Sequence, residues 1–178
     1  MAVDIATVDD YRDPIIEAVI AKLSPNGPSE LVGKYMNGKP EDYSQSELPL
    51  CYIYRGNTDD APITNEEDEI AHRLKAVVVY DRTQDLNEAY DMITGNSSLF
   101  KYVEKYDPVT LRLQSDCLLY QIRAGMTIAE NVWMGIKSRT IINYGVGMAG
   151  GGEDSFSVQA TIDFLVTQHD ATPTPSSN

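Results

Sequence analysis

Basic residues are scarce in this chain of 178 residues: 14 lysines and arginines stand against 27 acidic residues, giving a formal net charge of −13. A protein that holds nucleic acid places Lys and Arg on phosphates, and no basic run occurs anywhere in this sequence. We therefore do not expect tight binding to DNA, RNA or an anionic membrane. The excess of acid also keeps a protein soluble and repels other polyanions.

Cysteine, histidine and long apolar runs are scarce as well. Cys51 and Cys117 are the only cysteines, and without CxxC spacing we expect both to be small buried residues in a reducing cytoplasm. His72 and His169 have no H-x-x-x-H or H-E-x-x-H spacing, and His72 is expected to be structural. The first ten residues lack the pattern of a signal peptide, and no apolar run approaches membrane-spanning length.

The sequence offers no recognisable catalytic constellation. A nucleophile pair of Cys117 and His72 is arithmetically conceivable, but nothing near either residue supports it, and no G-x-S-x-G motif is present. We expect no enzymatic activity, no cofactor and no metal.

An acidic stretch from 57 to 69 is the one candidate for a cation site. It lacks the alternating ligands, central glycine and closing Glu of a calcium-binding loop, so it is predicted to be a solvated charged loop. The acids of this stretch are Asp59, Asp60, Glu66, Glu67, Asp68 and Glu69, of which the first five lie in the predicted loop 57–68.

A glycine-rich stretch matches G-x-G-x-x-G directly after a predicted strand. A dinucleotide site needs a helix at this point, because the pyrophosphate sits on the N-terminus of that helix. Here the period-two pattern of a strand follows instead, so we reject a nucleotide site and predict a flexible hairpin tip. The glycines of this tip are Gly145, Gly147, Gly150, Gly151 and Gly152.

The clearest secondary-structure signal is the alternation from Ser155 to Thr167. Its even positions from 156 to 166 are all apolar, whereas its odd positions are polar apart from Leu165. Such one-sided burial is typical of an antiparallel sheet that helices cover on one side. The predicted partner strands are residues 50–55, 69–81 and 137–144, and the first two form a β-hairpin with its long acidic tip at 57–68.

A first helix is predicted near the N-terminus. Its apolar stripe ends at Leu23, with Asp13 as the N-cap, Pro14 at the first helical position and a stop at 24–28. The following residues, 26–49, form a predicted loop, and a loop of this length is usually functional or ordered against a neighbour.

The middle of the chain is also predicted to be helical. Apolar stripes indicate helices over 86–94 and 99–106, and Asp107-Pro108 repeats the cap signature for a third helix to Gly125. Within that third helix, residues 109–113 fit a strand equally well. Residues 126–134 are predicted as a further helical turn.

Together these elements predict a single α+β domain over residues 1–169. It consists of a mainly antiparallel four-stranded sheet, covered on one face by helices, with long loops and a β-hairpin. Residues 170–178 are rich in Pro, Ser and Thr and are predicted to form a disordered C-terminal tail.

Several apolar residues in or beside the long loops are candidates for an interface. Tyrosine is favoured at interfaces because it is large, rigid and amphipathic, although several of the 11 tyrosines fall on predicted core stripes. The candidates for an oligomer or docking interface are Leu31, Val32, Tyr35, Met36, Tyr43 and Tyr54.

The order of these elements resembles that of the tail terminator and tail-completion proteins of long-tailed bacteriophages. The residues that carry the resemblance are the helix 15–23 (IIEAVIAKL), the strand 74–80 (LKAVVVY) and the strand 160–166 (ATIDFLV). The resemblance extends from Asp9 to Gln168 and lies in the pattern of elements rather than in a signature motif.

This resemblance implies a structural virion protein, assembled in the host cytoplasm, that forms a hexameric ring at the head-proximal end of the tail tube. The ring would end tube polymerisation and give the filled head a docking surface. Its partners would be further copies of the chain, the tail tube protein and a head-completion or connector protein, with no membrane contact. DNA would pass through without specific binding, along a lumen that we expect the loop acids to line.

Three alternatives remain open at the level of sequence. The chain could be another neck or head-tail connector protein, or a monomeric soluble adaptor or binding module. An enzyme of unrecognised type is the third alternative. Ring formation would distinguish a tail terminator from a monomeric adaptor. A tight pocket that holds a ligand or metal would favour an enzyme.

Overall fold

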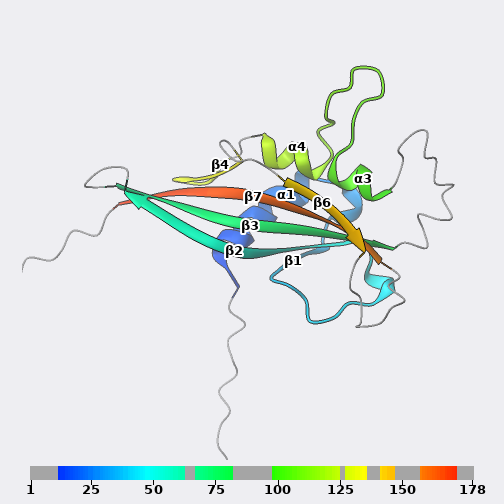
Figure 1. Cartoon of the computed structure of the whole chain (residues 1–178), viewed down its shortest axis with the longest axis horizontal. Helices are drawn as coiled ribbons and strands as arrows, with labels where there is room; N and C mark the ends of the chain where they lie inside the picture. The colour runs from blue at the N-terminus through cyan, green and yellow to red at the C-terminus, as the bar shows by residue number, and fades with distance from the viewer. Residues whose placement is uncertain are drawn as a thin grey trace, which may run out of the picture.

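The computed structural model of the chain describes residues 12–62, 67–81, 98–124, 127–135, 141–146 and 157–171. Long strands dominate this part of the chain, and short helices lie beside them (Figure 1). In chain order the elements are α1 (Pro14–Asn26), η1 (Ser29–Leu31), β1 (Tyr35–Asn37), η2 (Gln45–Glu47), β2 (Leu50–Pro62), β3 (Glu67–Asp81), α3 (Ser98–Val103), α4 (Leu118–Arg123), β4 (Thr127–Ala129), β5 (Val132–Met134), β6 (Ile141–Val146) and β7 (Ser157–Ala171).

The strands form one mixed, curled sheet around β3 and β7. Six strands follow the spatial order β1-β2-β3-β7-β5-β4, and β6 is a seventh that pairs with β7. β3 and β7 are antiparallel over their whole length, from Glu67↔Ala171 to Asp81↔Ser157. Along the other edge of β7, β6 pairs with residues 158–163 and β5 pairs with residues 166–168. β1 runs parallel to its partner β2, whereas the other described pairs are antiparallel.

The prediction of a mainly antiparallel four-stranded sheet under a helical cover is wrong, because the sheet is mixed, has more strands and makes up most of the described fold. Two segments without a visible strand pattern supply the difference. β1 lies inside the predicted loop 26–49, and the predicted helical turn 126–134 is the hairpin β4–β5. Each of these strands has three residues, too few for a period-two pattern to show. Asn131 reverses the chain with a φ of 63°, which Asn tolerates better than most residues.

The predicted acidic loop 57–68 is a pair of strand ends for most of its length. β2 continues to Pro62 and β3 begins at Glu67, with cross-strand pairs from Thr58↔His72 to Pro62↔Asp68. A register shift between Arg55 and Thr58 interrupts the ladder at the point where the hydrophobic alternation stops. Composition favoured a loop here, but pairing with β3 overrode that local preference.

Helix α1 begins as the sequence predicts. The Asp13 carboxylate accepts hydrogen bonds from the backbone N–H groups of Ile15 at 2.9 Å and Ile16 at 3.5 Å, and proline occupies the first turn. The buried stripe of the helix is Ile16, Val19 and Leu23. The helix then ends at Asn26.

The predicted helix from Asp107 to Gly125 is wrong over its first half. Asp107 does accept hydrogen bonds from the backbone N–H groups of Val109 and Thr110, as an N-cap would. However, Leu111 has a positive φ of 55°, and Tyr106 pairs with Leu113 in an isolated bridge, so the chain turns back instead of continuing as a helix. Only α4 is helical in this range. The predicted helix 99–106 corresponds to α3, which starts one residue earlier and ends at Val103. The predicted helix 86–94 lies outside the described residues.

Two clusters of buried side chains lie on opposite faces of the sheet. The main cluster joins α1, α3 and α4 to the even-numbered positions of β3 and β7. The alternation predicted in the last strand is confirmed there, since Ala160, Ile162, Phe164 and Val166 are all buried. The second cluster lies beneath the segment between β1 and β2 and consists of Leu48, Leu50, Tyr52, Val77 and Val79.

The last strand extends past the predicted start of the C-terminal tail. β7 ends at Ala171, so Asp170 and Ala171 pair with β3 instead of starting the predicted tail. Residues 172–178 lie outside the described residues. Cys51 and Cys117 are free and buried, as predicted.

Candidate functional site

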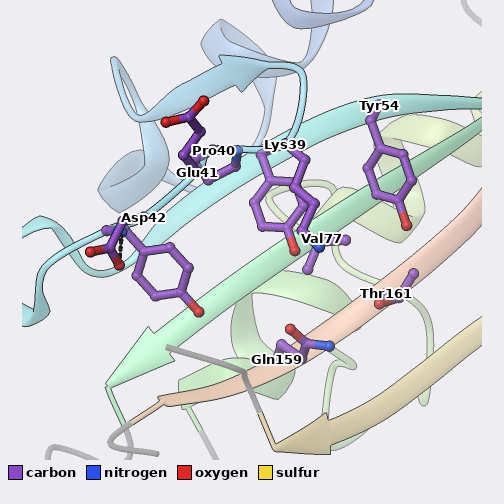
Figure 2. A pocket seen from close by; sticks show the side chains of 10 residues that line it. Lys39, Pro40, Glu41, Asp42, Tyr54, Val77, Gln159 and Thr161 are labelled. Atoms are coloured by element: carbon purple, nitrogen blue, oxygen red, sulfur yellow. Dashed lines mark hydrogen bonds between the residues drawn. The ribbon is translucent and has the colours of Figure 1, made fainter. Parts of the chain in front are cut away.

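The face of the sheet opposite the helices carries a pocket with a volume of ≈ 490 Å³ (Figure 2). Side chains of β2, β3 and β7 form its floor because the register places them side by side: Tyr52 pairs with Val77, and Val77 with Thr161. The segment 39–43 forms its wall, and Figure 2 shows this segment arching over the strands. The lining residues are Lys39, Pro40, Glu41, Asp42, Tyr43, Tyr52, Tyr54, Val77, Gln159 and Thr161.

The wall of the pocket is fixed to the sheet. The side-chain amide of Gln45 donates a hydrogen bond to the carboxylate of Asp81 at 2.8 Å. The hydroxyl groups of Tyr43 and Ser157 lie 3.4 Å apart. Leu48 is buried in the second cluster. The pocket is therefore preformed, which lowers the entropic cost of binding.

The lining of the pocket combines phenols with charged and amide side chains. Burial, reinforced by the neighbouring phenols of Tyr43 and Tyr54, raises the pKa of Tyr52 to about 12, so this phenol is a neutral O–H group at neutral pH. Glu41 and Asp42 stand exposed on the wall. Neither histidine nor cysteine is found among the described residues that line the cavity. Aromatic faces and hydrogen-bonding groups suit the recognition of an apolar or amphipathic surface.

A polar network joins α1 to three strands. Arg55 on β2 makes two charge-assisted hydrogen bonds to the Asp13 carboxylate, from Nε to Oδ2 at 2.6 Å and from Nη2 to Oδ1 at 2.9 Å. Nη1 of Arg55 donates to Nδ1 of His72 on β3, and Nε2 of His72 lies 3.1 Å from Oε1 of Gln168 on β7. Because Arg55 can only donate, the imidazole of His72 carries its proton on Nε2 and is neutral.

The charge states of this network follow from its geometry. The Arg55 side-chain hydrogen bonds hold the pKa of Asp13 below its usual value, and the backbone N–H groups of α1 act in the same direction. Burial lowers the pKa of His72, against the hydrogen bond to Gln168. His72 is thus a buried structural residue, as the sequence predicts, and it ties the start of α1 to the middle of the sheet.

Past this network the three long strands continue together as an arm, which we define as residues 59–62, 67–71 and 167–171. The buried residues of the main cluster on β3 begin only at Leu74. Figure 1 shows β2, β3 and β7 running on together to one end of the molecule. On the outer edge of β2, β1 covers only residues 51–53, and residues 54–62 have no strand partner there within the described part of the chain.

The hairpin β4–β5 supports the arm on its other side. The Trp133 and His169 rings meet edge to face with centroids 4.9 Å apart, and the His169 backbone N–H donates to the Asn131 carbonyl oxygen at 2.9 Å. His169 Nε2 lies 3.3 Å from a carboxylate oxygen of Glu69 on β3. The arm is therefore braced along β7 but open along β2.

Residues 104–116 form a projecting hairpin loop beside the helices, with an apolar tip of Val109 and Leu111 (Figure 1). Val109 is 87% exposed and Leu111 is 76% exposed. The tip is nevertheless ordered, because Asp107 accepts hydrogen bonds from the backbone N–H groups of Val109 at 3.0 Å and Thr110 at 2.6 Å. The projection therefore presents two aliphatic side chains to solvent on an ordered turn.

The structure does not bring the six predicted interface residues together. Leu31 is buried in the main cluster and has no surface to offer, which corrects its place among them. Val32 is 56% exposed and Met36 is 40% exposed, on the segment around β1. Tyr35 is half-buried, and its hydroxyl has no hydrogen-bond partner among the described residues. Of the six, Tyr43 and Tyr54 meet at the pocket; they are not alone there, since Tyr52 lies between them.

The predicted loop acids and glycines fall partly outside the described residues. Asp59 and Asp60 lie on β2, and Glu67 and Asp68 lie on β3, so these four acids belong to the arm. Glu66 is outside the described residues. Gly145 lies in β6 and pairs with Gln159, whereas Gly147 and residues 150–152 are outside the described part.

Sequence reasoning missed the Arg55 network and the apolar tip. The network joins residues far apart in the chain, so no local pattern announces it. The tip did leave a signal, the strand-like alternation of residues 109–113, but the cap signature of Asp107-Pro108 carried more weight.

No protein-family model matches the chain, and no curated protein matches its sequence. Across the described ranges, the structure contains no helix that is long and apolar enough to cross a membrane. The same ranges contain no group of three or more His, Cys, Asp or Glu side chains placed to hold a metal ion.

Proposed function

We propose that the chain is a structural virion protein, a tail terminator that forms a hexameric ring at the head-proximal end of a phage tail tube. The ring ends tube polymerisation and provides the surface on which the head docks. The proposal rests on the resemblance of the sequence pattern in residues 15–23, 74–80 and 160–166 to the tail terminators. The observation that carries it is the arm with its open β2 edge.

The long strands extend beyond the main cluster of buried side chains, so the arm lacks a core of its own. Strands of 15 residues span about 50 Å, and the main cluster covers only part of that length. A narrow ribbon of strands is marginally stable in water unless something packs on it. A neighbouring subunit is a natural source of that cover.

The edge of the arm supplies the means of joining. An exposed strand edge presents unpaired backbone N–H and C=O groups, to which another chain adds a strand. Asp59 and Asp60 lie on this edge strand, where charge discourages indiscriminate pairing. A head-to-tail contact of this kind closes into a ring when its rotation permits.

The charge of the chain fits a conduit for DNA. A lumen lined by acids lets DNA pass without specific binding, because like charges repel. In this proposal the partners are other copies of the chain, the tail tube protein and a head-completion or connector protein. The protein is assembled in the host cytoplasm, resides in the virion and has no catalytic role.

A second candidate is a monomeric adaptor or binding module, and the preformed pocket favours it. Its volume of ≈ 490 Å³ lies within the range of ligand-binding pockets, roughly 300–1,000 Å³. Another neck or connector protein would share the ring and differ in its position on the particle.

Native mass spectrometry over a range of concentrations, with negative-stain microscopy of tail tubes, tests the proposal. We expect closed rings, or rings that cap one end of the tube. Removing residues 59–62 together with 68–71 deletes four complete cross-strand pairs from the arm and should abolish the rings while the thermal unfolding of the body is retained. A full chain that stays monomeric and never caps a tube would reject the terminator in favour of the adaptor.

A further inference from the structure

We propose that the apolar tip of one copy of the chain inserts into the tyrosine-lined pocket of a second copy. The tip is Val109 and Leu111, and the pocket is the cavity walled by residues 39–43. This contact specifies how neighbouring copies join in the ring proposed above. It rests on the proposed function only because it takes the neighbour to be a second copy of the chain.

The tip projects from the molecule, whereas the pocket is a hollow in the opposite face of the sheet. The tip carries two nearly fully exposed aliphatic side chains on a turn that Asp107 holds in place. At the base of the projection, Lys105 and Asp116 form an ion pair at 2.6 Å. Because the projection is already ordered, little conformational entropy is lost when it is buried.

The lining of the pocket is mainly polar, but its floor carries a patch of aromatic and aliphatic side chains. Its floor contains the side chains of Tyr52, Tyr54 and Val77, and Tyr52 and Tyr54 stack with ring centroids 6.1 Å apart. Figure 2 shows the Tyr54 and Val77 side chains directed into the space beneath the wall. Tyrosine is enriched among the residues that contribute most to binding at protein interfaces.

The two surfaces face in different directions on one molecule. The tip arises between α3 and α4, which pack on the main cluster, whereas the pocket lies over the second cluster on the opposite face of the sheet. Figure 1 shows the projection and the β1–η2 segment on opposite sides of the strands. One copy therefore cannot fill its own pocket, and the contact must be head-to-tail, which generates rings or filaments rather than a two-fold dimer.

The charges around the two surfaces are complementary. Arg112 is exposed directly beside the tip, and Glu41 and Asp42 are exposed on the pocket wall, where Lys39 is the accompanying cation. Copies of a chain with a net charge of −13 repel one another at a distance. A local contact between Arg112 and the two wall acids offsets that repulsion and fixes the orientation of the pair.

Cross-linking tests the contact without any other phage component. Full-length Leu111→Cys chains are mixed with tagged Thr161→Cys chains and oxidised; the native cysteines are buried and serve as an internal background. We expect disulfide-linked pairs of the two different variants. A matched control mixes Leu111→Cys with Thr127→Cys, since Thr127 is exposed but lies outside the pocket, and no link is expected. Links only between two Leu111→Cys chains, or no mixed link at all, would overturn the proposal.

Sedimentation over a concentration series measures how strongly the copies associate. Leu111→Asp should weaken association roughly 100-fold, because it removes one buried anchor and adds a charge. Thr127→Asp adds the same charge at an exposed position outside the pocket and should leave association unchanged. Arg112→Glu should also weaken association, and the double change Glu41→Arg with Asp42→Lys should restore it in that background. Equal association of Leu111→Asp and the parent chain would refute the contact.

These results separate the contact from the terminator function. Mixed links between chains that never cap a tail tube would leave the contact standing and reject the terminator. If Leu111→Asp chains cap the tube, and Leu111→Cys and Thr161→Cys chains do not cross-link, the terminator function would stand and the contact would be rejected.

Discussion

The two faces of the sheet are built from the same strands but serve different purposes. On β3, Leu74, Ala76 and Val78 point to the helices, whereas Val77 and Val79 point to the opposite side. On the helix side, three helices contribute side chains to one continuous apolar cluster. On the other side, a smaller cluster borders the pocket. We infer that the first face holds the fold together and the second is available for recognition.

The largest contrast should appear within β7 itself. Phe164→Ala on the helix face should lower the free energy of unfolding by about 3–5 kcal/mol, because it leaves a cavity in the main cluster. Thr161→Ala, three residues away on the pocket face, should change it by about 0.5 kcal/mol or less. Urea denaturation of both variants measures the difference. Similar losses in the two variants would show that the faces share the stabilisation.

A second contrast concerns the junction of β5 with α4. Gly135 has a φ of +83°, and a Cβ atom there would lie 1.7 Å from the Ile122 carbonyl oxygen. Gly135→Ala should therefore lower the free energy of unfolding by about 3 kcal/mol or more. The alanine would have to adopt a strained positive φ, and the backbone at Ile122 would have to move away from the added Cβ atom. Gly38→Ala is the matched control: its φ is +91°, but nothing lies within 4 Å of the added Cβ. Thermal unfolding should rank Gly135→Ala well below the control; the opposite order would contradict the close approach.

A smaller effect should come from the Asp13–Arg55 pair beneath the arm. The folded pKa of Asp13 is depressed, chiefly by the side-chain hydrogen bonds from Arg55, so the carboxylate stabilises the fold above its unfolded pKa. That contribution is lost as the pH falls through the lower, folded pKa. Asp13→Asn should therefore be less stable than the parent chain at pH 7, and the gap should begin to narrow as the pH falls below about 4. Asp42→Asn, on the exposed pocket wall, is the control.

His72 in the same network gives a pH effect of opposite origin. Burial lowers its folded pKa, so the unfolded chain binds more protons below about pH 6.5 and stability falls as the pH decreases from that value. His72→Gln keeps a polar side chain without the titration, and its stability should depend less on pH between about 7 and 5. Chemical denaturation at a series of pH values measures this. Parallel pH profiles for the two chains would exclude His72 as the cause.

The smallest effect on stability, but a distinct effect on function, is expected from the arm acids. Replacing Asp59, Asp60, Glu67 and Asp68 by lysine should leave the main cluster intact, because these residues lie beyond it. In assembled particles the added positive charge should slow or block DNA release through the proposed lumen. DNA release as fast as that of the parent particles would remove these acids from the lumen.

The elements that the sequence predicted well are those with local causes. The start of α1 was predicted from Asp13 and Pro14, because an N-cap satisfies backbone N–H groups within the same turn. The alternation of β7 was visible because a long strand repeats its pattern many times. The prediction that Cys51 and Cys117 are buried, made from their lack of CxxC spacing, is confirmed.

The elements that were missed depend on partners distant in sequence. Three-residue strands such as β1 and β4 exist only because longer strands pair with them. Asp107 carries a valid cap signature, yet Leu111 turns the chain away from a helix. The same holds for the arm, where pairing with β3 extends β2 through a stretch whose composition is that of a loop.

The sequence by itself determined the acidic charge, the long amphipathic last strand and the capped first helix, because these depend on composition and on neighbours a few residues away. Only the tertiary structure decided how many strands the sheet has, which tyrosines line a pocket and where Arg55 finds Asp13 and His72. The reason is that strand pairing joins residues at any separation along the chain, so backbone hydrogen bonds to a distant partner outweigh a weak local preference.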